Sequence, residues 1–270
     1  MKKTIRIPKN AENRTIKLKG KSGFSQISIV AEEGSKTTII EDISDNANRK
    51  EVIEIIAKPN SEIRFGAVQK LPDCENIVSR KAVIHKNANV EWLEIITGSS
   101  ITKSETCSEL VGEGAKSSIF TVFFGNKKQQ FEFVNKCVHI GKNTESDMHT
   151  SGALKDKAKA LQQGFAKIEK KAYNASAHQK SKILLLSEDA RALPTPKLEI
   201  DNNEVVATHQ ASVGQIESEK IFYLMSRGID EREAKKLFVE GFFEQYMSRI
   251  PVSELREDVE TIVAERMEDD

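Results

Sequence analysis

Hydrophobic and polar residues alternate in short runs over most of the first two hundred residues. The segments 5–7, 16–18 and 27–29 each place one polar residue between two aliphatic residues. Successive side chains of a β-strand point to opposite faces, so this alternation predicts half-buried strands. Longer, more apolar runs predict further strands at Ile119–Phe124, Phe131–Ile140, Leu161–Ile168 and Ile183–Leu186.

Turn signals rich in Gly, Asn and Asp separate these runs at similar but unequal intervals. Examples are Gly112-Glu113-Gly114, Gly125-Asn126-Lys127 and Gly141-Lys142-Asn143. Many short strands with recurring turns predict a mainly β fold, which is a sandwich, a barrel or a solenoid. The periodicity does not choose among these three.

The pattern changes to helical spacing after Gly214. A first apolar run ends at Gly228, a residue typical of helix ends. Asp230 then stands as an N-cap three residues before Glu233, and Pro251 ends the helix that follows. A third helix is predicted from Ser253, with its apolar stripe at Leu255, Val259, Ile262 and Met267. We therefore expect a β body at residues 1–216 and a helical domain at residues 217–270.

The tail carries more aromatic residues than three short helices can bury among themselves. Phe222, Phe238, Phe242, Phe243 and Tyr246 all lie within it. Some of these rings are therefore expected to face the β body or a partner.

Charge and hydropathy limit the function classes. The chain has 41 Lys and Arg against 41 Asp and Glu, so its formal net charge is zero. That balance predicts neither nucleic acid nor an anionic membrane as a main partner. No apolar run approaches the roughly 20 residues of a membrane helix, and the start lacks the apolar stretch of a signal peptide. The expected location is cytoplasmic.

Motifs for self-contained catalysis are absent from the sequence. It has no Gly-x-x-x-x-Gly-Lys-Ser/Thr phosphate loop, no Gly-x-Ser-x-Gly and no His-Glu-x-x-His. These absences argue against a nucleotide hydrolase and the common hydrolases. We therefore expect a protein that is not an enzyme in its own right.

Cysteine and histidine supply the candidate metal chemistry. Cys137 and His139 lie two residues apart, so on a strand both side chains point to one face. A thiolate and an imidazole suit a soft or borderline metal, but two ligands do not complete a site. The alternative is that both are structural core residues. Cys107 is an isolated candidate with acidic neighbours, which favours a buried structural role.

An ordered series of motifs from Ser181 onward carries a family resemblance. It begins with Lys182-Ile183-Leu184-Leu185-Leu186 and a proline-flanked Lys197-Leu198-Glu199-Ile200. It continues with Thr208-His209-Gln210-Ala211-Ser212-Val213-Gly214 and Phe222-Tyr223-Leu224-Met225-Ser226-Arg227-Gly228-Ile229, and then Gly241-Phe242. This series resembles the C-terminal core of the SufB/SufD family of SUF iron–sulfur cluster assembly scaffolds.

The resemblance implies a fold and a set of partners. It implies a parallel β-helix, or solenoid, followed by C-terminal helices. It also implies pairing with a second SufB/SufD-type chain and binding of a SufC-type ABC ATPase, whose ATP cycle remodels the scaffold interface. The cofactor to expect is a transient iron–sulfur cluster, with none tightly bound.

Candidate site residues follow from the resemblance and from the cysteine and histidine pattern. His209, Cys137, His139 and Cys107 are candidates for cluster assembly, and His209 is the candidate metal ligand. The candidates for ATPase contact are Phe222, Tyr223, Arg227, Gly228 and Phe242. Those for the scaffold interface are Leu185, Val205 and Val213.

Two departures from the family pattern keep alternatives open. Ser181 stands where SufB-type members have a sulfur-accepting cysteine, and Gln210 stands where they have a glutamate. His209 is kept, which is the SufD-like pattern. The chain is then a SufD-like subunit or the single scaffold of a reduced system, and a platform that never ligates a cluster is a further alternative. A β-solenoid that binds or acts on carbohydrate is the other, although aromatic residues make up only 6% of the chain.

Overall fold

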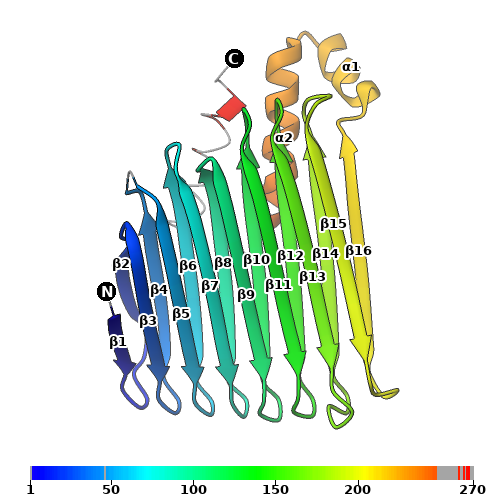
Figure 1. Ribbon diagram of the computed structural model, residues 1–270. Helices are drawn as coiled ribbons and strands as arrows, with labels where there is room; N and C mark the ends of the chain where they lie inside the picture. The colour runs from blue at the N-terminus through cyan, green and yellow to red at the C-terminus, as the bar shows by residue number, and fades with distance from the viewer. Residues whose placement is uncertain (1, 46, 248–260, 262–263, 265, 268–270) are drawn as a thin grey trace.

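The computed structural model describes residues 2–45, 47–247, 261, 264, 266 and 267, and within them sixteen strands precede two helices (Figure 1). The strands are β1 (Lys2–Ile7), β2 (Arg14–Lys19), β3 (Gly23–Ala31), β4 (Lys36–Ile43), β5 (Arg49–Ala57), β6 (Glu62–Leu71), β7 (Glu75–Ile84), β8 (Asn89–Gly98), β9 (Ile101–Leu110), β10 (Lys116–Gly125), β11 (Gln130–His139), β12 (Glu145–Leu154), β13 (Lys159–Ile168), β14 (Ser176–Leu185), β15 (Arg191–Ile200) and β16 (Val206–Gln215).

The strands form two parallel sheets of eight. The odd-numbered strands make one sheet, in the order β1 to β15, and the even-numbered strands make the other, in the order β2 to β16. Each coil of chain contributes one strand to each sheet, and the coils stack along one axis (Figure 1). The prediction of a mainly β parallel solenoid followed by helices is therefore confirmed.

In-register pairing stacks like residues on the interior. Trp92 lies in register between Phe65 and Ile119, and all three side chains point between the sheets and are fully buried. The Trp92 ring lies 5.4 Å from that of Phe65, and its Nε1 donates to Ser108 Oγ at 3.1 Å. Rows of this kind form the core, because each inward residue covers the residue of the coil before it.

The turns that join odd to even strands repeat one backbone feature. All but the last of them, between β15 and β16, have a residue with φ between 50° and 70°, in the left-handed region, and these are Asn10, Gly34, Asn60, Asn87, Gly114, Asn143 and Asn174. The N–H of each donates to a carbonyl in the corresponding turn of the next coil, at 2.8–3.1 Å. We call this row the Asn/Gly turn ladder. Asn and Gly suit it because they adopt positive φ at low cost.

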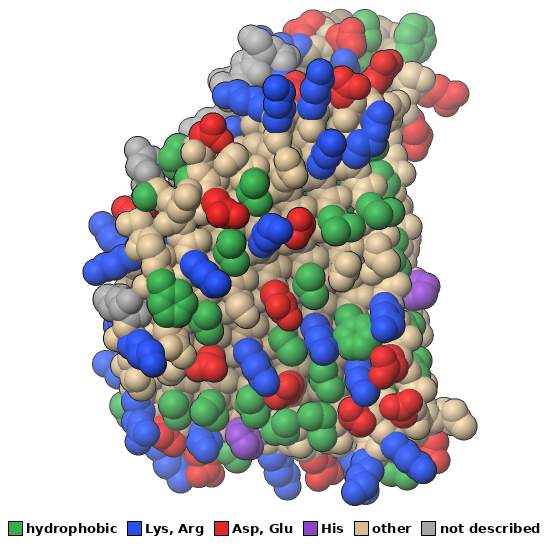
Figure 2. Space-filling view, in the orientation of Figure 1, with side chains coloured by type: hydrophobic (Ala, Val, Ile, Leu, Met, Phe, Trp, Pro, Cys, Tyr) green, Lys and Arg blue, Asp and Glu red, His purple; other side chains and the backbone are tan. Residues whose placement is uncertain are grey.

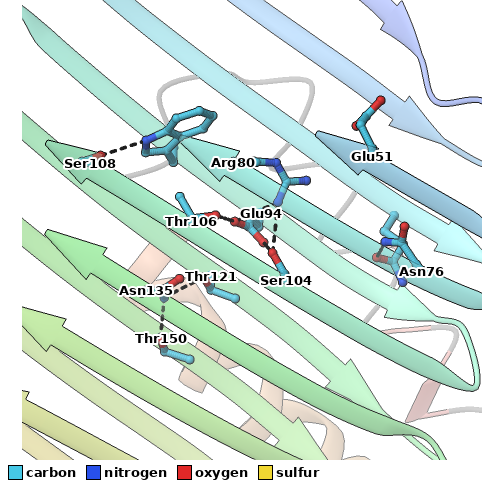
Figure 3. A network of polar contacts seen from close by, with 12 residues as sticks. Glu51, Asn76, Arg80, Glu94, Ser104, Thr106, Ser108, Thr121, Asn135 and Thr150 are labelled. Atoms are coloured by element: carbon cyan, nitrogen blue, oxygen red, sulfur yellow. Dashed lines mark hydrogen bonds and ion pairs between the residues drawn. The ribbon is translucent and has the colours of Figure 1, made fainter. Parts of the chain in front are cut away.

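The interior is not entirely apolar. Polar and charged side chains from both sheets meet in the interior of the solenoid. They extend from Glu51 and Asn76 through Arg80 and Glu94 to Asn135 (Figure 3). Hydrogen bonds join them across the sheets, as where Asn135 Nδ2 donates to Thr121 Oγ1 at 3.1 Å. The buried polar groups are thus largely paired with one another, as burial requires.

Two helices follow β16, namely α1 (Ser218–Ser226) and α2 (Glu231–Met247). Gly228 adopts φ +88° after α1, and its N–H donates to the carbonyl of Met225 at 3.0 Å, which confirms the predicted helix end. Asp230 Oδ1 accepts the N–H of Glu233 at 3.0 Å, which confirms the predicted N-cap. The third helix lies mostly outside the described residues; Met267, at the end of its predicted stripe, is buried.

Helix α2 packs against the outer face of the even-numbered sheet. Val239, Phe242 and Phe243 form a buried cluster with Leu184 of β14 and Phe124 of β10. The expectation that some tail aromatics face the body is therefore confirmed for Phe242 and Phe243. None of the helices described is long and apolar enough to span a bilayer.

The Asn/Gly turn ladder predicts the effect of changing Asn87. Its side chain donates to Asn60 Oδ1 at 3.4 Å, and its φ is +52°. Replacing it with Ala puts a less tolerant residue in the left-handed region, so we expect a loss of about 1 kcal/mol in the free energy of unfolding. Urea titration measures this loss. Asn87→Gly is the control, and an equal loss in both variants would contradict the backbone explanation.

Candidate functional site

The last coil leaves one end of the solenoid open. β15 and β16 are the terminal strands of their sheets, and no described strand pairs with their far edges (Figure 1). Their inward side chains are consequently exposed or half-buried, whereas the same rows are buried in earlier coils. The inward residues of the open end, as the register places them, are Ala192, Pro194, Pro196, Leu198, Ile200, Ala207, His209, Ala211, Val213 and Gln215.

His209 lies on this open end, above a buried polar floor. It is exposed and pairs in register with Gln179 of β14, while Ser181 lies two residues further along the same inward row. Gln179 and Ser181 are only 6% and 5% exposed. Gln179 Nε2 donates to the carbonyl of Lys197 at 3.0 Å, whereas Gln179 Oε1 and Ser181 Oγ have no hydrogen-bond partner among the described residues.

The two departures from the family pattern fall on opposite sides of the even-numbered sheet. Ser181 points inward, beneath the terminal strand, and pairs in register with Ala211. Gln210 follows His209 and therefore points to the outer face, in register with Lys180. The Ser181 hydroxyl and the outward Gln210 amide therefore supply neither a thiolate nor a carboxylate beside His209.

Cys137 and His139 point to the same face, as their spacing predicted, but that face is the closed interior. Both are fully buried. His139 Nδ1 lies 2.9 Å from Thr144 Oγ1, and Nε2 lies 2.8 Å from Ser146 Oγ, so both ring nitrogens are engaged. Burial lowers the pKa of His139 to about 4, and it raises the pKa of the Cys137 thiol well above its usual range. A neutral imidazole and a protonated thiol favour the structural interpretation of this pair.

Cys107 lies on the outer face of the odd-numbered sheet. It is half-buried and stands in register between Lys81 and Lys136. Burial raises the pKa of its thiol, although Lys136 acts in the opposite direction. Cys137, for its part, is separated from the terminal strand β15 by β13, so it lies about 10 Å below the open end. The structure therefore brings neither cysteine to His209.

Metal-ligand groups do not converge elsewhere on the part of the chain described. No set of three His, Cys, Asp or Glu side chains is placed to share an ion there. Within the described residues, His209 accordingly offers one imidazole and no companion ligand.

Helix α1 presents a second exposed surface next to the open end. Phe222 and Tyr223 are 71% and 58% exposed, and the Arg227 guanidinium lies 5.4 Å from the centroid of the Tyr223 ring. Gly228 ends the helix at this surface. A groove of about 780 Å³ separates α1 and α2 from the ends of β14 and β16, and its apolar lining includes Leu186, Ile216, Ile221, Phe222 and Met225.

Four predicted contact residues have positions that the sequence did not show. Phe242 is 5% exposed and packs against the even-numbered sheet, so it attaches α2 to the body and offers no surface to a partner. Leu185 points into the solenoid, where it packs against the inner cluster containing Ile183. Val205 is half-buried against the main core, whereas Val213 is 38% exposed at the open end.

The apolar faces of Ile183–Leu186 have an explanation within the chain. Ile183 faces the interior and Leu184 faces helix α2, so no second chain is needed to cover either side. The polar floor at Gln179 was missed because polar residues on a strand normally indicate a solvent-exposed face. The alternation Ala177, Gln179, Ser181, Ile183 was the available signal, since it extends the inward row of β14 toward its start.

Comparisons with known proteins agree with this geometry. A family model described as SUF system FeS cluster assembly, SufBD core domain, matches residues 14–242. The iron–sulfur cluster assembly protein SufD of Bacillus subtilis is 32% identical over 251 residues, covering 90% of this chain and 57% of that protein. SufBD family proteins of Staphylococcus epidermidis and Staphylococcus aureus are 29% and 28% identical, covering 92% of this chain and 56% of each relative. The chain thus spans a little over half the length of these relatives.

Proposed function

Because the chain belongs to the SufB/SufD family of SUF iron–sulfur cluster assembly proteins, we propose that it is a scaffold subunit with two docking surfaces. The open end pairs with a second SufB/SufD-type chain, and helix α1 binds a SufC-type ABC ATPase. The ATPase cycle then remodels the scaffold interface where a cluster forms. Because the chain belongs to this family, we set aside the alternative of a β-solenoid that binds or acts on carbohydrate.

The observation that carries this proposal is the uncovered last coil. The coil before it, β13 and β14, buries most of its inward row beneath the last coil, whereas the last coil leaves His209 and Val213 exposed. The free edges of β15 and β16 also present backbone donors and acceptors that another strand would satisfy. A second solenoid stacked on this end would cover the apolar row and both edges together.

The two edges differ in what they offer to a partner strand. Pro194 and Pro196 lie in β15 and lack an N–H, as is typical of an edge strand. β16 contains no proline, so its edge keeps its full set of donors. We infer that β16 carries most of the backbone pairing between the two chains.

The ligand inventory favours a partner with different residues at this end. His209 is exposed, but Ser181 has a hydroxyl where a soft thiolate would suit iron. Cys137 is sealed in the interior, and Cys107 lies on an outer face. We therefore infer that a SufB-type partner supplies the thiolate, while His209 supplies an imidazole ligand or moves protons near neutral pH. In the platform-only alternative, His209 is structural.

Helix α1 is proposed as the ATPase contact because its exposed aromatics have no role in the body. Phe222 and Tyr223 lie outside the buried α2 cluster, and the groove beside them is lined by charged residues of both signs, including Glu231, Arg232 and Lys235. Exposed aromatic residues of this kind are typical anchors of protein interfaces. Deleting the whole helical tail would not test this contact cleanly, because the deletion would also expose the apolar face of β14 that α2 covers.

The scaffold interface is tested by Val213→Arg. A charged side chain at the buried centre of an interface costs several kcal/mol, so we expect association with the second scaffold chain to weaken by at least about a hundredfold. Sedimentation or light scattering of the mixed chains measures this. Leu161→Arg is the matched control, because Leu161 is 37% exposed on the odd-numbered sheet against 38% for Val213. Equal association of both variants would contradict the placement of the interface.

The ATPase contact is tested by Phe222→Ala in the chain with its ATPase. Loss of an aromatic anchor costs about 2 kcal/mol or more, so binding should weaken at least about thirtyfold. Calorimetry or co-purification measures the loss. Phe24→Ala is the control, because Phe24 is 54% exposed on β3 at the other end of the molecule. Unchanged binding of the Phe222 variant would remove α1 from the interface.

The role of His209 is tested by His209→Ala in the complete complex. We expect cluster yield on anaerobic reconstitution to fall severalfold while ATPase binding is unchanged, because an imidazole at the interface is lost and α1 is untouched. His178→Ala is the control, since His178 is exposed on the outer face of the same sheet. A normal cluster yield from the His209 variant would support the platform-only alternative.

A further inference from the structure

Five charged side chains are sealed inside the early coils of the solenoid. Glu41, Arg49, Glu51, Arg80 and Glu94 are each at most 3% exposed, and they are the only buried Asp, Glu, Lys or Arg residues among those described. They come from β4, β5, β7 and β8, and the close-up view shows part of this network between the sheets (Figure 3). With all five ionised, three carboxylates face two guanidinium groups and the interior carries a net charge of −1.

Hydrogen-bond donors surround the carboxyl group of Glu94. Arg80 Nη1 forms an ion pair with its Oε1 at 3.0 Å. Ser104 Oγ donates to Oε2 at 2.7 Å, and Thr106 Oγ1 donates to Oε1. Three donors on one carboxylate stabilise the charged form, because an ionised carboxylate is an acceptor only.

Glu51 is similarly provided with donors. Ser25 Oγ donates to Glu51 Oε1 at 2.7 Å, and Arg49 Nη2 contacts Oε2. Arg49 shares the same Nη2 with Glu41 Oε1, so a single guanidinium nitrogen serves both carboxyl groups. One cation is therefore divided between two acids.

Glu41 is the carboxyl group of this cluster that has one oxygen without a hydrogen bond. Its Oε2 has no hydrogen-bond partner among the described residues, and its Oε1 meets Glu51 Oε2 at the same Arg49 nitrogen, so the two carboxyl groups lie side by side. Two ionised carboxylates repel each other at that separation, whereas a protonated Glu41 donates to Glu51 and satisfies the unpaired oxygen. The neighbouring strands place no further charge beside Glu41, because in register it lies between Leu18 of β2 and Ala67 of β6.

We propose that the interior of the solenoid takes up one proton as the pH falls through neutral, held on Glu41 and shared with Glu51. An uncompensated charge is costly to bury, and one proton makes the five-residue cluster neutral. Desolvation by burial raises the pKa of Glu41 to about 7, with Glu51 acting in the same direction and Arg49 and Arg80 in the opposite one.

The bound proton makes the stability of the body depend on pH in a defined direction. The folded pKa of Glu41, about 7, lies above its usual 4.5, so in that range the folded state binds more protons than the unfolded state. The stabilisation of the folded state by this proton is complete below about pH 4.5 and is lost as the pH rises through 7. Below this pH range Glu41 is protonated in both the folded and the unfolded state, and above the range it is protonated in neither.

The isosteric Glu41→Gln variant tests the proposal, because an amide keeps a donor beside Glu51 without a titrating proton. Urea unfolding is measured at about pH 5 and about pH 8. Between these values, the unfolding equilibrium constant of the natural protein should rise on the order of a hundredfold relative to that of the variant, since one unit of pKa is tenfold. The matched control is Glu94→Gln, which leaves Arg80 without its carboxylate and should destabilise the body at both values.

Infrared spectra of the natural protein provide a second measurement that needs no variant. The proposal expects the C=O stretching band of a protonated, buried carboxylic acid at neutral pH, and this band should disappear when the pH is raised well above 7. Absence of that band would overturn the proposal. So would equal pH dependence of the natural protein and Glu41→Gln. Stability that responds to the concentration of a monovalent cation instead of to pH would also overturn it, because a bound ion would then balance the cluster.

Discussion

The in-register hydrogen bonds between successive coils determine almost everything else in this molecule. Each strand pairs residue by residue with the strand one coil away, so a position on one coil fixes what its equivalents on the next coils touch. A one-residue slip would turn every inward side chain outward. The rows of the core, the polar interior and the Asn/Gly turn ladder all follow from this register.

The register also explains which parts of the fold could be predicted from the sequence. Alternation revealed strands such as the one containing residues 27–29, because Ile27 and Ile29 mark its inward face. Strand β14 was recognised only at its apolar end, since Gln179 and Ser181 are polar residues that point inward. The turn ladder went unnoticed as a repeat, because Asn and Gly interchange and the spacing grows from 24 to 31 residues between Asn10 and Asn174.

The candidate site was predicted in part, for a physical reason that differs between residues. His209 and Val213 lie at the open end because they belong to the last strand, and no local pattern shows that a strand is the last one. Cys137 and His139 share a face as their spacing required, but the sequence could not show that the opposite sheet closes over that face. The resemblance made Phe242 a candidate contact residue, and the spacing of α2 does not reveal that the even-numbered sheet covers that side of the helix.

The stacked arrangement gives the open end a distinctive energetic position. In a one-dimensional stack, each coil is held only by its neighbours, so an outer coil loses about half of the contacts available to an inner one. β15 and β16, like β1 and β2 at the other end, are therefore expected to fray more readily than β8 or β10, so the surface proposed for pairing belongs to one of the less firmly ordered coils of the body. Docking of a second chain would then complete the folding of this coil as well as cover it. Affinity at this end would be lower than its buried area suggests, and association would remain readily reversible.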